Sequence, residues 1–396
     1  MGRGSLKINR ARIRTILLFE ALVIYAFYFQ VYPNLPRGQL LALGTFLASG
    51  RAIDMGLPPY GSHREIYDAI GSNDYSPNLN PPVTLLLFQR IAWIDPQVAF
   101  RSWYAITILL FLLALAMVYR AYPEHVTLLR VTWALSSVGL WATLREGQLY
   151  MPLALATIGA WLLLRRDHPV PAGILIGILV AIKPNYAVWP VLLLLVGIWP
   201  ATLAAGCVVS LLSLAPLYVY GTSVYTGWLN ILPSGESLAS PVNASLTGFA
   251  TRFGMAPIGE IASAALLLTL AWWTWRRRPD VLQVSSIALV ASMLASPLSW
   301  LHYSVILLPV FFSRSWTPAW WACALLLLVP DYLLWYIQFH VPQWTWEAGI
   351  VSTGTLTLLL ILLVRPVLLD RVHRPGVDAV LVEHPHGDVP LPGTAD

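Results

Sequence analysis

The stretch LPRGQLLALGTFLASGRAIDMGLPPYGSHREIYDAIGSNDYSPNLNPP, residues 35–82, is the longest polar interruption in the first half of the chain, and apolar runs lie on both sides of it. It concentrates Asp54, Glu65, Asp68 and Asp74 in a protein with only 11% charged residues. A segment that concentrates ionisable groups between two apolar runs is either a solvated loop or part of a site. We therefore interpret this stretch as a solvated loop that also forms part of a binding site.

The composition excludes a soluble protein. Hydrophobic residues make up 57% of the 396 residues. Soluble domains carry roughly 25% charged residues, more than twice the share found here, so this chain cannot cover a water-exposed surface. The net charge of +5 comes from basic residues at the ends of apolar runs, which is not a nucleic-acid-binding pattern. We expect no disulfide framework, no metal site and no cofactor, because the only two cysteines lie in apolar runs.

The apolar runs predict an all-α membrane protein, a polytopic bundle of about 12 transmembrane helices. The first run, residues 16–32, follows five basic residues, which places the N-terminus in the cytoplasm. Further runs at residues 103–118, 128–143 and 319–336 are each expected to form one continuous span. The protein is thus predicted to cross the plasma membrane many times, with both termini cytoplasmic.

The predicted organisation has three parts. Residues 1–15 form a cytoplasmic segment, residues 16–365 form the membrane domain, and residues 366–396 form a cytoplasmic tail that we expect to be disordered. Within the membrane domain, residues 33–82 and 221–257 form outer loops. In the first of these, residues 39–49 are apolar but too short to span, so we expect an interfacial helix.

Polar side chains from three distant helix ends meet on the predicted outer face. They are Gln148, Lys183 and His302. Lys183 ends an apolar helix before Pro184, where it could bind a phosphate as a point charge or simply extend to the membrane interface. His302 could donate a hydrogen bond to a phosphate. Arg145 offers a second contact for an anion, although it could also belong to a solvated helix end.

A series of short motifs resembles one known family. In chain order they are Gly-Leu-Pro-Pro-Tyr60, Asn78-Leu-Asn-Pro-Pro82, Gly147-Gln148, Lys183-Pro184, Asn243-x-Ser245 and Ser296-Pro-Leu-Ser-Trp-x-His302-Tyr303. Over about residues 15–365 the chain is similar to glycosyltransferase family 87, which includes polyprenyl-phosphate-mannose-dependent α-mannosyltransferases. The resemblance implies the C-type membrane glycosyltransferase fold and a polyprenyl-phosphate-sugar donor. With it, we predict substrate binding by Asn80, Arg145, Gln148, Lys183, His302 and Tyr303.

One departure from the family pattern concerns the catalytic base. Members carry an aspartate in the first outer loop, shortly before a Gly-x-Pro-Tyr-like segment, and residues 39–44 contain no acid. Asp54 is the nearest acid and our predicted base, although it lies closer to the glycine than the family aspartate does. Glu65, Asp68 and Asp74 remain open as alternatives, and so does Glu146 outside the first loop.

The predicted function is therefore an integral membrane hexosyltransferase of the cell envelope, and the sugar implied by the resemblance is mannose. It would move the sugar from a polyprenyl phosphate to a lipid or glycan acceptor on the outer face. The alternatives are a transporter or flippase of a lipid-linked sugar, and a polysaccharide polymerase or ligase. A transporter predicts internal repeats, and a ligase predicts several arginines in residues 221–257, where only Arg252 occurs.

Overall fold

The computed structural model describes residues 10–34, 40–72, 74–231 and 238–372. These residues are almost entirely helical and contain no strand, only an isolated antiparallel bridge between Asn243 and Trp300. The predicted all-α class is confirmed. The predicted segment before residue 10 and the tail after residue 372 lie outside the described residues.

The first half of the chain, in order, contains α1 (Arg10–Tyr25), η1 (Ala26–Val31), α2 (Ala42–Asp54), α3 (Arg64–Ile70), η2 (Pro82–Thr84), α4 (Leu85–Ile91), α5 (Pro96–Ala121), α6 (Leu128–Ser136), α7 (Val138–Glu146), α8 (Tyr150–Arg165), α9 (Pro169–Ile182) and η3 (Pro184–Ala187). The second half contains α10 (Val188–Leu195), α11 (Trp199–Tyr220), α12 (Ser223–Asn230), α14 (Leu246–Thr251), α15 (Ala256–Arg277), α16 (Val281–Leu294), η4 (Leu301–Leu307), α17 (Leu308–Phe312), α18 (Pro318–Leu326), α19 (Asp331–His340), η5 (Pro342–Trp344) and α20 (Thr345–Val372).

Among the described residues, five helices are long and apolar enough to cross a membrane. They are Ile13–Val31, Pro96–Ala121, Trp199–Tyr220, Ala256–Arg277 and Pro342–Arg365. A sixth span results if the bent pair α18 and α19 is taken as one, and several apolar helices of 10–17 residues accompany them. Many large apolar side chains on these helices are exposed, such as Leu18, Leu109 and Leu211, as lipid contact requires. The chain is thus a multi-pass membrane protein.

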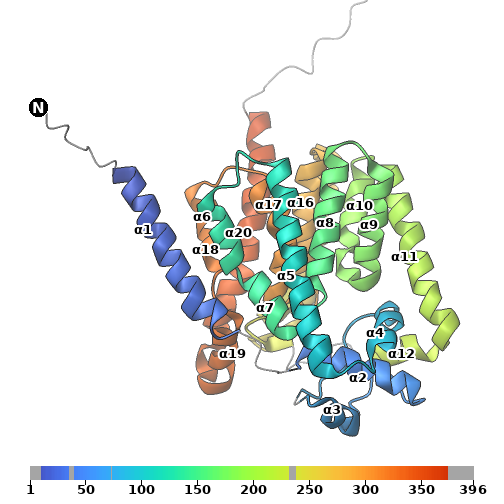
Figure 1. Ribbon diagram of the computed structural model, residues 1–396. Coiled ribbons are helices and arrows are strands. Elements are labelled where there is room, and N and C mark those ends of the chain that lie inside the picture. The colour runs from blue at the N-terminus through green and yellow to red at the C-terminus, as the bar shows by residue number, and fades with distance from the viewer. Residues whose placement is uncertain (1–9, 35–39, 73, 232–237, 373–396) are drawn as a thin grey trace, which may run out of the picture.

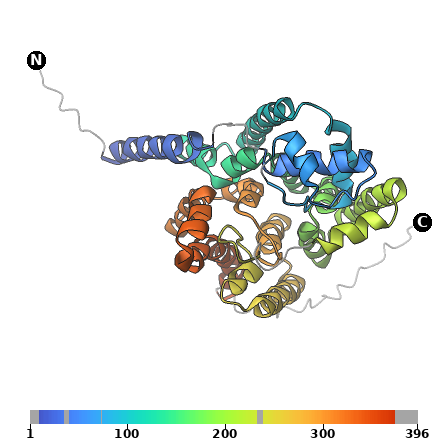
Figure 2. The ribbon, with the colours of Figure 1, turned by 90° about the horizontal axis from the view of Figure 1, so that it is seen from below.

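The two ends of the bundle differ. Figure 1 shows the beginning of α1 and the end of α20 on one side, and α2, α3, α4 and α12 gathered on the opposite side. We call this second side the loop end. Seen from below in Figure 2, α1 extends outward from the bundle, and its C-terminal end meets the bundle beside α6. The loop end contains the predicted first outer loop.

The core of the bundle is α16, in which every residue from Val284 to Leu294 is buried. The Asp280 side chain caps the helix by accepting hydrogen bonds from the backbone N–H groups of Leu282 and Gln283, both at 3.0 Å. Helix α16 ends just before residues 296–303, which reach the loop end. A rigid central helix therefore positions this segment.

Three predicted elements differ in the structure. Residues 128–143 form two helices, α6 and α7, which are separated at Ser137 because its extended backbone (ψ 142°) interrupts the helix. Residues 319–336 form α18 and α19, which meet at a bend of 59° next to Pro330. The expected interfacial helix is α2, but most of its side chains are buried inside the protein, partly because Phe46 stacks on Phe88 of α4 with ring centroids 4.4 Å apart. The last helix also continues beyond residue 365, the predicted end of the membrane domain.

Candidate active site

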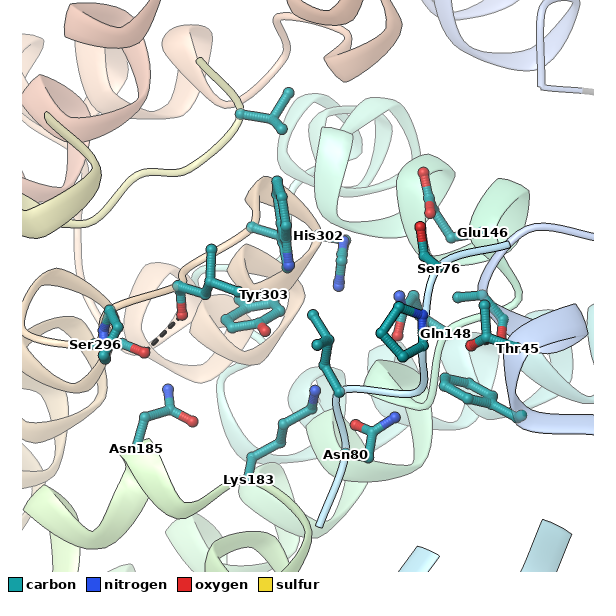
Figure 3. A pocket seen from close by; sticks show the side chains of 18 of the residues that line it. Thr45, Ser76, Asn80, Glu146, Gln148, Lys183, Asn185, Ser296, His302 and Tyr303 are labelled. Carbon is teal, nitrogen blue, oxygen red and sulfur yellow. Dashed lines mark hydrogen bonds between the residues drawn. The ribbon is translucent and has the colours of Figure 1, made fainter. Parts of the chain in front are cut away.

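A cavity of about 720 Å³ lies at the loop end of the bundle. Its walls come from α2, the segment after α3, the α7–α8 junction, the α9–η3 junction, residues 296–303 and α19. Figure 3 shows side chains from these distant segments around one space. Five predicted site residues line it, namely Asn80, Gln148, Lys183, His302 and Tyr303.

Lys183 is the cation in this cavity. It ends α9, where its backbone N–H donates to Leu179 O at 2.8 Å, and Pro184 then starts η3. Its Nζ lies 5.1 Å from the ring centroid of Tyr150 and 5.4 Å from that of Tyr303. In the described part of the chain no carboxylate forms a salt bridge with it. Burial lowers the pKa of the Lys183 ammonium to about 7.

His302 is buried beside the same two tyrosines. Its ring meets those of Tyr150 and Tyr303 edge-on, with centroids 4.9 Å away in both cases. Its Nε2 is buried and has no hydrogen-bond partner among the described residues. Figure 3 shows His302 and Lys183 directed into the same space. A buried ring nitrogen that lacks a partner is suited to a ligand oxygen.

Gly147 shapes the wall between α7 and α8. Its φ of 67° lies in the left-handed region, and the turn is closed by Gln148 N–H donating to Thr143 O at 3.0 Å. A Cβ atom on Gly147 would lie only 2.8 Å from the Cβ of Leu43 in α2. Glycine therefore allows both the turn and the close approach of α2. As a result, Glu146 and Gln148 lie on the cavity wall, on either side of the turn.

Arg145 does not line the cavity but holds two side chains that do. Its guanidinium donates to both carboxylate oxygens of Asp331, at 3.0 and 2.7 Å, and to Glu146 Oε1 at 2.6 Å. A phosphate would have to displace these carboxylates, so the predicted direct contact of Arg145 with an anion gains no support from this geometry. Sequence reasoning missed Asp331 as its partner, because 186 residues separate the two in the chain.

The cavity contains groups of both charges. Lys183 and His302 lie beside the two tyrosines, and the carboxylates of Asp74, Glu146 and Asp331 come from the first loop, α7 and α19. The lysine can bind an anion, and the carboxylates can accept hydrogen bonds from hydroxyl groups. Among the described residues, no group of three His, Cys, Asp or Glu side chains is arranged to hold a metal ion.

Asp54, the predicted base, lies apart from this cavity. Its carboxylate accepts hydrogen bonds from Gln89 Nε2 and Trp93 Nε1, both at 2.6 Å, and so fastens α2 to the region of α4. Glu65 and Asp68 do not line the cavity either, and Asp68 accepts a hydrogen bond from Tyr75 Oη at 2.7 Å. Of the first-loop acids considered, only Asp74 reaches the cavity.

We expect the Asp54→Asn variant to retain transferase activity. The side chain lies outside the cavity and does not touch the reacting groups, so the rate should stay within about threefold of wild type, which is about 0.6 kcal/mol of activation free energy. Initial rates of the purified variant and wild type provide the measurement. Loss of activity in a folded variant that still binds donor would restore Asp54 as the base.

A comparison with known families adds to this geometry. The family model of glycosyltransferase family 87 matches residues 78–297, more than half of the chain. The chain belongs to glycosyltransferase family 87. No curated protein matches it. The matched region includes Asn80, Gln148 and Lys183, and it ends five residues before His302.

The structure gives two of the short sequence motifs a structural role in the first loop. Asn78 Oδ1 accepts from the backbone N–H of Asn80 at 3.0 Å and from its Nδ2 at 2.9 Å, which forms a tight turn. Tyr60 Oη donates to Asn80 O at 3.0 Å. The Asn80 Oδ1 atom is buried without a hydrogen-bond partner among the described residues, so it can accept from a ligand hydroxyl.

The Asn243-x-Ser245 motif ties the second loop to the segment that carries His302. Asn243 Nδ2 donates to Leu238 O at 3.0 Å and to Pro297 O at 3.1 Å. Its Oδ1 accepts from the backbone N–H groups of Ser245 at 3.2 Å and Ser299 at 2.9 Å. Because Asn243 is fully buried, this motif acts as an internal clamp and not as a glycosylation site.

Proposed function

We propose that this family-87 glycosyltransferase moves a hexose from a polyprenyl-phosphate donor to a hydroxyl group of a lipid or glycan acceptor. The observation that carries the proposal is Lys183, a cation that forms no salt bridge with any described carboxylate and lies in a cavity at the end of a membrane bundle. A polyprenyl-phosphate sugar combines an anionic group with a lipid tail, and this is the combination that such a cavity can accommodate. Mannose is the sugar that the family resemblance implies.

The same proposal covers the arrangement in the membrane. The loop end faces outward, the beginning of α1 and the end of α20 face the cytoplasm, and the membrane is the plasma membrane. The shorter apolar helices complete about 12 membrane segments in a C-type glycosyltransferase fold extending over residues 16–365. Figure 1 supports one part of this arrangement, because the beginning of α1 and the end of α20 lie on the same side.

The chemistry follows from the charge distribution. The donor phosphate lies beside Lys183 and His302, while Asn80, Gln148 and Tyr303 hydrogen-bond to the sugar or to the phosphate oxygens. The departing phosphate gains negative charge as the glycosidic bond breaks, and a fixed cation in a partly dry cavity stabilises that charge. The acceptor hydroxyl attacks the anomeric carbon from the opposite face and loses its proton to a carboxylate.

Two observations favour this function over its alternatives. Family membership supports a transferase rather than a transporter or flippase. Arg252, the arginine that a ligase would need in the second loop, is engaged inside the protein, where its guanidinium donates to Ser240 O at 2.9 Å and to Asn243 O. It does not line the cavity.

Donor binding is expected to weaken as pH rises. Since the pKa of Lys183 is lowered to about 7, the charged form decreases above neutral pH, and affinity should fall by at most about tenfold per pH unit beyond 7. The donor is a phosphodiester of constant charge in this range, so the protein is the source of the change. Titration of wild type with a polyprenyl-phosphate hexose between pH 6 and 9 provides the measurement.

The Lys183→Arg variant is the control for this titration. Arginine remains charged throughout the range, so the slope should disappear even if the affinity itself is lower. Equal slopes in wild type and the variant would show that Lys183 does not bind the donor phosphate.

A further inference from the structure

The catalytic base of the proposed reaction must be a residue that lines the cavity, where the acceptor hydroxyl would bind. Helix α2 contributes Ala42, Thr45 and Phe46 to the wall, and none of these can accept a proton at neutral pH. The base must therefore come from another element. The lining acids are Asp74, Glu146 and Asp331.

Asp331 is the least available of the three. Both of its carboxylate oxygens accept hydrogen bonds from Arg145, and its side chain is only 7% exposed. Glu146 is bound through Oε1 alone, and its side chain is 21% exposed. The Oε2 atom of Glu146 therefore has room for an acceptor hydroxyl.

The Arg145 cluster is suited to accept one proton. Its single guanidinium faces two carboxylates, which leaves the cluster with one excess negative charge. A proton on Glu146 removes that excess, and Arg145 remains paired with Asp331. Burial raises the pKa of Glu146, an effect that Arg145 opposes and that Asp331 and Asp74 reinforce.

The position of Glu146 is also fixed by the backbone. It is the last residue of α7, directly before the Gly147 turn that packs against Leu43. Helix α7 in turn packs closely on η4, because a Cβ atom on Gly139 would lie 2.6 Å from the backbone N of Val305. The same rigid unit thus holds Glu146 and the segment that carries His302.

We propose that Glu146 is the catalytic base of this transferase, held in place by Arg145 and Asp331 as positioning residues. The inference rests on the proposed function. Glu146 takes the proton from the acceptor hydroxyl as its oxygen forms a bond to the anomeric carbon. The bond from that carbon to the phosphate oxygen breaks, and its electron pair leaves with the polyprenyl phosphate beside Lys183.

Asp74 is the rival within the cavity. Its Oδ1 accepts a hydrogen bond from the backbone N–H of Ser76 at 3.0 Å, so the side chain stabilises the local turn of the loop. In the described part of the chain no cation pairs with it. Nothing comparable to Arg145 fixes its carboxylate toward the cavity, which favours Glu146.

The test compares Glu146→Gln with the matched control Glu65→Gln, an exposed carboxylate of α3 outside the cavity, using donor binding and transfer as separate readouts. Glutamine keeps an oxygen that can accept from Arg145, so the cavity should remain intact. We expect Glu146→Gln to bind the polyprenyl-phosphate hexose as wild type does and to transfer it about 10²–10⁴-fold more slowly, the usual contribution of a general base. Glu65→Gln should transfer the sugar at about the wild-type rate, because its side chain lies outside the cavity.

The pH profile distinguishes a base from a structural residue. Wild type and Glu65→Gln should lose activity on the acid side as the base becomes protonated, and this limb should be absent from the residual activity of Glu146→Gln. Glu146→Asp should recover part of the rate. Near-normal transfer by Glu146→Gln, or an unchanged acid limb in it, would overturn the proposal. Failure of wild type to bind the donor would instead refute the proposed function, and the binding readout reports that separately.

Discussion

The Lys183→Ala variant is expected to transfer sugar about 10²–10³-fold more slowly than wild type, the loss typical of removing one group that stabilises developing negative charge. Lys183 Nζ lies over the rings of Tyr150 and Tyr303 and forms no salt bridge among the described residues. Its charge is therefore available for the donor phosphate. The phosphate gains charge as it departs, so kcat should fall along with donor affinity. Single-turnover rates at saturating donor provide the measurement.

Arg101→Ala is the control for this variant. Arg101 is an exposed cation near the start of α5 and does not line the cavity, so its removal changes the net charge by the same amount. We expect its rate to match wild type. Full activity in Lys183→Ala, or an equal loss in both variants, would show that Lys183 does not stabilise the donor phosphate.

The Asn243→Ala variant should lower the free energy of unfolding by about 2–4 kcal/mol. The substitution leaves the backbone N–H groups of Ser245 and Ser299 without their acceptor, and each buried unsatisfied group costs about 1–3 kcal/mol. It also removes the hydrogen bond from Asn243 Nδ2 to the Pro297 carbonyl oxygen. That oxygen then accepts only from the hydroxyl of Ser245. Thermal unfolding in detergent, in the absence of ligand, provides the measurement.

Asn185→Ala is the matched asparagine variant. Asn185 is partly exposed and forms a single long hydrogen bond of 3.4 Å to Ser292 O, so its loss should change stability by only about 0.5 kcal/mol. Similar unfolding midpoints for Asn243→Ala and wild type would show that the clamp between the second loop and residues 296–303 contributes little.

Continuous apolar runs predicted the long helices well, because hydropathy reports directly on contact with lipid. The runs that form α5, α11 and α15 are helical from end to end. Hydropathy does not report a backbone break inside an apolar run, so the separation of α6 and α7 at Ser137 was missed. The bend between α18 and α19 was missed as well, although Pro330 marks it in the sequence, because a proline disfavours continuation of a helix.

The cavity was predictable only in part. Placing helix ends on one face correctly brought Gln148, Lys183 and His302 together, since that inference needs only the direction of each helix. The pairing of Arg145 with Asp331 depends on tertiary packing and left no pattern in the sequence. For the same reason Asp54 could not be separated from Asp74 before the structure showed which of them reaches the cavity.

The most direct test of the account is the choice of donor. Purified protein would be given labelled hexose on a polyprenyl phosphate or on a nucleoside diphosphate, together with a membrane lipid extract as acceptor. Transfer from the polyprenyl phosphate alone is the predicted result. The cavity contains Lys183 and His302 as partners for a single phosphate group, and it lies at the end of a membrane bundle, where a lipid tail can be accommodated. Transfer from the nucleotide sugar alone would contradict the account.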